Sequence, residues 1–274
     1  LNKSDVLPFE LVWKPTLITN ELIRKTFNEA NADEECAGVI TWMHTFSPAK
    51  SWILGLKEYR KPLCHLHTQF NQEIPYDTID MDFMNLNQAA HGDREYGFIV
   101  ARMGIPHEVV AGYYKHDDVV AKIRQFASVA KAISYSKSLK VASFGNNMRE
   151  VAVTDGDRVE SQIKYGWECN YFALGDVVDT INAVTEEEID AKMKEYTDKY
   201  TMKTDRIDSV REQAKYEVGL EKFLAANGIG AFADTFQDLH GLKQLPGIAA
   251  QNLMAKGIGF GPEGDYKISA LSAV

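Results

Sequence analysis

The chain has 274 residues, of which 45% are hydrophobic and 25% charged, a composition typical of globular proteins and long enough for two domains. Its formal net charge of −9 argues against nucleic acid as the main partner, because phosphate binding requires a basic face. No apolar run approaches membrane-spanning length, so no membrane partner is expected. The three cysteines are odd in number and far apart, which predicts reduced thiols in a cytoplasmic protein.

The first half of the chain alternates candidate strands with candidate helices. Strands are predicted at 9–13, 37–42, 62–67 and 108–114. Helices are predicted at 21–30, 48–59 and 117–135, with Asn20 and Ser47 as N-caps of the first two. This alternation predicts a parallel sheet with right-handed crossovers.

The segment 80–97 mixes amides, carboxylates and an imidazole with apolar side chains. Read as one helix, it places Met84, Gln88, His91 and Glu95 on one face at spacings of three and four residues. Such a face suits a sugar, whose hydroxyl groups require both donors and acceptors. The alternative is a helix end with a satisfied polar cluster. A glycine at position 92, inside the predicted helix, indicates that another group approaches closely there.

A second unit is predicted to begin near Leu139, which gives domains of 1–138 and 139–274. Its strands are predicted at 140–144 and 170–174, and its helices at 157–165, 185–200, 207–226, 246–256 and near the end of the chain. Thr185 begins a capping box, and Gly228 is expected to end the long helix before it. Loops are predicted at 145–150 and 235–241, and a glycine-rich turn at 257–265.

Glu263 lies in that glycine-rich turn, between Pro262 and Gly264. Glycines allow a close approach of the backbone, and a carboxylate there can bind a hard divalent metal or move a proton. The alternative is a turn residue in water. Met148 and Phe236, in the two loops of the second unit, either line a pocket or fill core.

The histidines carry weaker signals. His44 and Phe46 follow a predicted buried strand, at the edge where open α/β sheets bind ligands, although loop packing explains them as well. His65 and His67 share one face of a strand and so can share a metal. With no third ligand apparent, partly buried histidines with satisfied hydrogen bonds are the preferred interpretation. His240, like Phe236, either lines a pocket or fills core.

These pieces resemble the L-arabinose isomerase family. The matching blocks are 37–38, 44–50, 67–71, 80–97, 147–157, 238–247 and 263–266. The resemblance implies an α/β fold of two Rossmann-like or flavodoxin-like parallel-sheet domains, the fucose isomerase-like architecture. It also implies an aldose–ketose isomerase that interconverts L-arabinose and L-ribulose, and D-galactose and D-tagatose, through an ene-diol.

The resemblance further implies roles for individual residues. Glu263 matches the first of two catalytic glutamates, which is also a ligand of the divalent metal, Mn²⁺ with Co²⁺ possible. Met148 and Phe236 match pocket residues of the same subunit. Phe46, Gln88 and His91 match residues that reach the sugar from a neighbouring subunit, which implies a homo-trimer or a hexamer of trimers. No role is carried over for His44, His65, His67 or His240.

One departure from the family is large. The family has an N-terminal strand and a C-terminal β-rich domain that supplies the second glutamate and two metal-binding histidines, and this chain does not contain their motifs. We therefore expect the chain to be an interior portion that does not isomerise sugar by itself. The alternatives are a non-catalytic two-domain sugar-binding protein and a ketol isomerase similar to L-fucose isomerase.

Overall fold

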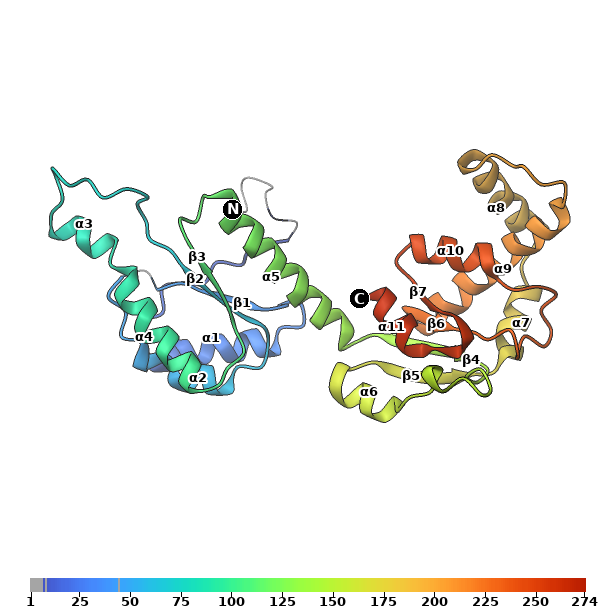
Figure 1. Ribbon diagram of the computed structural model, residues 1–274, viewed down its shortest axis with the longest axis horizontal. Helices are drawn as coiled ribbons and strands as arrows, with labels where there is room; N and C mark the ends of the chain where they lie inside the picture. The colour runs from blue at the N-terminus through green and yellow to red at the C-terminus, as the bar shows by residue number, and fades with distance from the viewer. Residues whose placement is uncertain (1–6, 8, 44) are drawn as a thin grey trace. The chain divides into compact units, whose positions relative to one another are not determined.

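The computed structural model describes residue 7, residues 9–43 and residues 45–274. The chain divides into two compact units, Leu1–Ser134 and Tyr135–Val274 (Figure 1). Each unit is built on a sheet in which all strand pairs are parallel, which confirms the predicted α/β fold. None of the three cysteines forms a disulfide, as expected. Among the described residues, no helix is both long and apolar enough to cross a bilayer.

Unit 1 has the strand order β1-β2-β3, with β2 in the centre. Its elements are α1 (Asn20–Ala32), β1 (Val39–Thr41), the 3-10 helix η2 (Ala49–Trp52), α2 (Ile53–Glu58), β2 (Leu63–His67), α3 (Met81–Leu86), α4 (Ala89–Arg102), β3 (Glu108–Ala111) and α5 (Asp117–Ser136).

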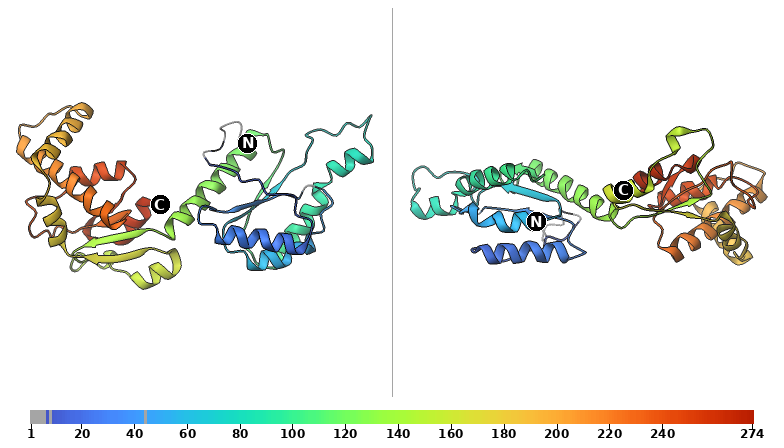
Figure 2. Two further views of the ribbon diagram at one scale, coloured as in Figure 1. Left: turned by 180° about the vertical axis from the view of Figure 1, so that it is seen from behind. Right: turned by 90° about the horizontal axis from the view of Figure 1, so that it is seen from below.

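The side chains of β2 alternate between two apolar layers of unit 1. Leu63 packs into a cluster with residues of α1, α2 and α4. Cys64 and Leu66 point the other way and pack against α5. Helices therefore cover both faces of this sheet, and Figure 2 shows α1 and α5 on opposite sides of the strands.

Three local predictions for unit 1 were wrong. The N-cap of α1 is Thr19, whose Oγ1 accepts a hydrogen bond from Leu22 N (3.2 Å), and Asn20 is already helical. Ser47 does not cap, because the first turn is a 3-10 turn that begins after Pro48. Residues 10–18 form neither helix nor strand. Phe9 and Leu11 pack on the α5 side of the core, so apolar alternation there reflects packing without a strand ladder.

Unit 2 has the strand order β5-β4-β6-β7, the order of flavodoxin-like sheets. Its elements are β4 (Lys140–Phe144), the 3-10 helix η3 (Ala152–Thr154), α6 (Arg158–Tyr165), β5 (Glu168–Phe172), α7 (Leu174–Asn182), α8 (Glu186–Lys199), α9 (Ile207–Asn227), β6 (Ala231–Ala233), α10 (Gly247–Ala255), β7 (Gly259–Gly261), the 3-10 turn η4 (Pro262–Gly264) and α11 (Tyr266–Ala273).

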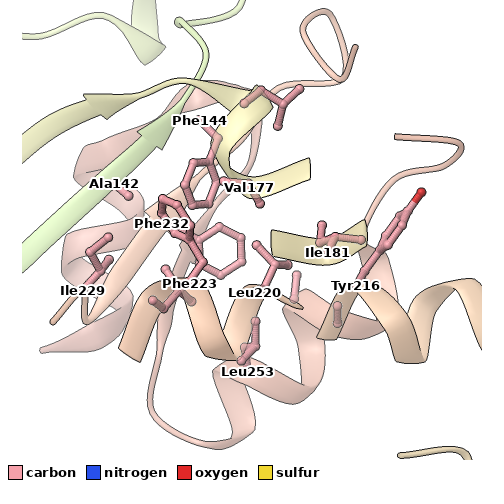
Figure 3. Close-up of a cluster of buried hydrophobic side chains, with 14 residues drawn as sticks. Ala142, Phe144, Val177, Ile181, Tyr216, Leu220, Phe223, Ile229, Phe232 and Leu253 are labelled. Atoms are coloured by element: carbon pink, nitrogen blue, oxygen red, sulfur yellow. The ribbon is translucent and has the colours of Figure 1, made fainter. Parts of the chain in front are cut away.

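Aromatic rings fill the core between this sheet and helices α7, α9 and α10 (Figure 3). The ring of Phe144 lies 5.6 Å from that of Phe223 and 5.8 Å from that of Phe232, between ring centroids. The opposite face of the sheet packs against Tyr266 and Ala270 of α11. The turn that contains Glu263 joins β7 to α11. One end of the turn therefore continues from the sheet, and the other leads into a helix that packs against it.

A buried carboxylate connects helices α8, α9 and α10 of unit 2. Glu217 of α9 is 1% exposed and accepts hydrogen bonds from Tyr196 Oη (2.5 Å), Asn252 Nδ2 (2.7 Å) and Lys256 Nζ (3.0 Å). The Nζ of Lys192, also buried, lies 3.3 Å from the same carboxylate. Burial raises the pKa of Glu217, but these donors outweigh burial and hold its pKa below the ordinary value.

The chain forms more strands in unit 2 than the sequence predicted. The glycine-rich segment 257–265 contains strand β7, and β6 and α7 were not predicted. Strand β5 begins two residues earlier than expected, at Glu168. The predicted capping box at Thr185 is present, and Gly228 ends α9 in the left-handed conformation (φ 64°).

Candidate active site

The candidate site of unit 2 lies at the carboxyl ends of its parallel strands. The strand order reverses between β4 and β6, and ligands of open α/β sheets bind in the crevice at such a switch point. The loops that follow β4, β6 and β7 contain Met148, Phe236 and Glu263 respectively. The three residues assigned to this unit by the sequence are therefore carried by one edge of one sheet.

Hydrogen bonds join these loops to one another. Met148 N donates to Glu263 O (2.9 Å), which ties the loop after β4 to the turn after β7. Gly264 N donates to Asp234 O (2.7 Å), which ties that turn to the end of β6. Arg149 N donates to the side chain of Gln237 (2.7 Å), which closes the connection between the first two loops. The three loops after β4, β6 and β7 are therefore connected to one another by hydrogen bonds.

Glu263 adopts a backbone conformation that is unusual for a residue with a side chain. Its φ is 63° and its ψ is 17°, in the left-handed region. The next residue, Gly264, also has positive φ (77°), and a Cβ atom there would lie 2.7 Å from Asn147 Cα. Such strain persists only where the surroundings impose it, and it concentrates at functional sites. Glu263 as a whole residue is half-buried, so part of it remains accessible to solvent.

Met148 and Phe236 flank this turn with apolar surface. Met148 is half-buried, and Phe236 is 54% exposed although it follows a fully buried strand. The Phe236 ring is therefore available to a ligand at the carboxyl edge of the strand. The interpretation of both residues as core is wrong.

Asp234 is a residue of this edge that the sequence did not single out. It follows β6 directly and is only 6% exposed. Burial raises the pKa of its carboxyl group from the ordinary 3.8 to about 6. An aspartate after a short apolar run is common in sequences, and only the fold reveals that this one is enclosed.

Glu263 is the residue of this edge for which a metal-binding role was predicted. The carboxylate of Glu263 is the kind of oxygen donor that divalent cations take. Among the described residues, however, no group of three His, Cys, Asp or Glu side chains is arranged to hold a metal ion. One carboxylate is too few ligands to hold a metal ion, so Glu263 alone does not make a metal site.

In unit 1, the structure brings together two of the three predicted sugar-contacting residues. The rings of Phe46 and His91 are in contact, with centroids 4.3 Å apart. Both side chains are exposed, Phe46 by 58%. Gln88 is half-buried at the N-cap of α4, and its carbonyl oxygen accepts a hydrogen bond from His91 N (3.2 Å).

The prediction of one helix across 80–97 was wrong. The segment forms α3 and α4, separated at Asn87. The Asn87 side chain accepts a hydrogen bond from Asn71 N (2.7 Å) and donates one to Phe83 O (3.0 Å), which competes with continued helix formation. Met84 therefore lies on a different helix from His91, whereas His91 and Glu95 do share α4.

Helix α4 packs closely on the loop that carries Phe46. A Cβ atom at Gly92 would lie 2.8 Å from Thr45 O, which confirms the predicted close approach. Glu95 accepts a hydrogen bond from Ala49 N (3.2 Å) and fastens the other end of the loop. The contact between Phe46 and His91 is thus supported on both sides.

His65 and His67 share a carboxylate. Asp93 of α4, 3% exposed, has its Oδ1 2.7 Å from His65 Nε2 and its Oδ2 3.2 Å from His67 Nε2. Both histidines thus lie beside a carboxylate, but His65 is fully buried and its Nε2 and both Asp93 oxygens make no hydrogen bond of good geometry, so the predicted satisfied hydrogen bonds are not found. The carboxylate joins α4 to the end of β2. His44 lies outside the described residues, and His240 is exposed.

Comparisons with known proteins cover the whole chain. Residues 1–138 match the family described as L-arabinose isomerase N-terminal domain, and residues 140–274 match L-arabinose isomerase central domain. The chain is 58% identical over 272 residues to L-arabinose isomerase of Clostridium beijerinckii and 55% identical over 277 residues to that of Geobacillus thermodenitrificans. These alignments cover 99% of this chain but 55% and 56% of the relatives. The chain therefore spans about half the length of the curated relatives that it matches.

Proposed function

Because this chain belongs to the L-arabinose isomerase family, we propose that the protein containing it interconverts L-arabinose and L-ribulose. We extend the proposal to D-galactose and D-tagatose as slower substrates. We also propose that it works in the cytoplasm as a homo-oligomer, a trimer or a hexamer of trimers.

The observation that carries the proposal is the conformation of Glu263. A strained turn after β7 is bonded to the loops after β4 and β6, the two strands that flank the switch point of the sheet, which supports a functional role for Glu263. Aldose–ketose interconversion through an ene-diol moves a proton between C1 and C2 of the sugar, and a positioned carboxylate can accept and return that proton. Met148 and Phe236 supply the apolar wall for the sugar's carbon faces.

We propose Mn²⁺ as the cofactor, with Co²⁺ as a substitute and Glu263 as the one ligand that these residues supply. When bound, a divalent ion acts as a Lewis acid toward the sugar oxygens. Among the described residues no group of three potential ligands is found, so the proposal assigns only Glu263 to the metal.

Unit 1 is proposed to complete the sugar site of a neighbouring copy. The exposed Phe46 ring offers an apolar face, and His91 and Gln88 offer a donor and acceptor pair at the start of α4. Sugars present both surfaces, alternating C–H faces and hydroxyl groups. A sugar bound in the neighbouring copy would then cover side chains that are exposed in the single chain.

The decisive experiment replaces Glu263 by Gln in the full-length protein and measures ketose formation from L-arabinose with Mn²⁺ added. The change keeps side-chain size and removes the proton acceptor, so we expect a loss of about 10²- to 10⁴-fold in kcat. Glu187→Gln, on the exposed side of α8, is the matched control and should leave kcat unchanged. Full activity of the Glu263→Gln variant would refute the proposal.

The lack of a three-ligand metal group among the described residues favours a second candidate, a non-catalytic sugar-binding protein. This candidate predicts metal-independent binding of L-arabinose without turnover, which calorimetry on the chelated protein would detect. A panel of aldoses separates a third candidate, an isomerase that prefers L-fucose.

A further inference from the structure

Arg158, the first residue of α6, occupies an unusual position for a cation. Its guanidinium lies between two aromatic rings, 4.0 Å from the centroid of Tyr171 and 4.4 Å from that of Tyr266. Within the described part of the chain no carboxylate pairs with Arg158, and its Nε is buried without a hydrogen-bond partner. Its placement is therefore set by ring stacking and by neutral hydrogen-bond acceptors.

These acceptors belong to the strand and loop that lead to the candidate site. Arg158 Nη2 donates to Asn147 Oδ1 (3.2 Å) and reaches Ser143 Oγ at the end of β4 (3.4 Å). The Asn147 amide in turn donates to Thr154 O, which fixes the loop on its far side. The residue after Asn147 is Met148, whose N–H is bonded to Glu263 O.

A second path leads from Arg158 to the same turn. The stacked ring of Tyr266 is completely buried and belongs to the first turn of α11, three residues after Glu263. The Cα atom of Asn147 also packs against Gly264 so closely that a Cβ there would be 2.7 Å away. Arg158 thus contacts the supports of the Glu263 turn from both sides, through Asn147 and through Tyr266.

We propose that Arg158 is a positioning residue that holds Glu263 in its left-handed conformation, a role that rests on the proposed function of Glu263. A planar guanidinium can stack on two rings with its faces while it donates from its edge. An ammonium group cannot stack in this way, and an apolar side chain cannot donate. Removing the guanidinium removes both the hydrogen bond to Asn147 and the stacking contact with the Tyr266 ring, so both supports of the turn become more mobile.

The first test measures amide hydrogen exchange in the full-length protein with Arg158→Met, which keeps an unbranched stem in the same space. We expect the amides of Met148 and Gly264 to exchange at least about tenfold faster, because their bonds to Glu263 O and Asp234 O define the turn. Exchange in the core strand β4 should be unchanged. Arg211→Met, which removes an arginine paired with Glu186 and Asp190 on the surface, is the matched control.

The second test measures steady-state kinetics with L-arabinose for the same variants and for Arg158→Lys. Misplacing a reacting group by about 1 Å can lower the rate by about 10²-fold, so we expect kcat to fall 10- to 100-fold in Arg158→Met while KM changes less than threefold. Arg158→Lys keeps a cation and a donor and should recover part of the loss. It also replaces the methionine variant if that variant does not fold.

Unchanged exchange at Met148 and Gly264 in a folded Arg158→Met protein would overturn the inference. So would faster exchange spread evenly over unit 2, because Arg158 would then only stabilise the domain. The exchange experiment needs no turnover, so it decides the role of Arg158 even if the wild-type protein leaves L-arabinose unchanged. That last outcome would refute the proposed function alone.

Discussion

The buried carboxyl group of Asp234 makes the stability of the protein depend on pH in a specific direction. Its pKa is about 6 in the folded state and about 3.8 when exposed, so folding favours the protonated form. The contribution is fully present below pH 3.8 and is lost as the pH rises through 6. A shift of about two pKa units corresponds to about 3 kcal/mol.

The variant Asp234→Asn removes this titration. The difference in unfolding free energy, variant minus wild type, should increase by about 2 kcal/mol between pH 4.5 and 7.5, the part of the linkage that falls in this window. Any constant effect of the amide cancels, because only the change with pH is compared. Urea denaturation at a series of pH values and one protein concentration measures it.

The matched control is Asp205→Asn, an exposed aspartate in the loop before α9, which should give a difference that stays flat with pH. A flat difference for Asp234→Asn would refute the reasoning, since it would show that water or an unrecognised donor solvates this carboxylate in the folded protein. A difference that falls with rising pH would mean that the folded state prefers the charged form.

Three further predictions concern packing and charge. Glu217→Gln should destabilise the protein by about 1–3 kcal/mol near neutral pH, because Lys192 and Lys256 lose the buried carboxylate that they share while Glu195 and Glu221 still pair with them. Since the folded pKa of Glu217 is lowered, this difference should shrink as acid protonates the wild-type side chain below its ordinary pKa, and a constant difference in urea titrations would contradict it. Phe232→Ala should lower the unfolding free energy by about 3–5 kcal/mol, measured by the urea midpoint, unless the core collapses around the cavity. Gly92→Ala should lower it by about 1–3 kcal/mol, because its Cβ meets Thr45 O, and an unchanged melting temperature would show that the loop can move aside.

The order of most elements could be predicted because their signals are local. The capping box at Thr185 and the left-handed Gly228 are decided by a few neighbouring residues, and both are present. Strands β6 and β7 were missed for the opposite reason. Each has three residues, one phenylalanine between two alanines in β6 and one between two glycines in β7, and pairing with neighbours distant in sequence makes them strands.

In the candidate site, too, the local features could be predicted from the sequence and the long-range contacts could not. Glu263 could be selected from its glycine-rich surroundings, but its positive φ, its hydrogen bond from Met148 and the bond of the next residue, Gly264, to Asp234 depend on the sheet. The break between α3 and α4 depends on Asn71, sixteen residues from Asn87. No periodicity or spacing reveals a contact of this kind, because it forms only when the chain returns to the same place.

The strand order of unit 2 also determines when the site can form during synthesis. Strand β4 pairs with β6 90 residues further along the chain, in the register Val141 with Ala231. At a translation rate of about 5–20 residues per second, β4 waits about 5–20 seconds for this partner. Through that interval its apolar edge is available to chaperones or to other nascent chains. Glu263 follows β7, the last strand of this sheet, so a ribosome-bound chain synthesises all four strands before it reaches this carboxylate.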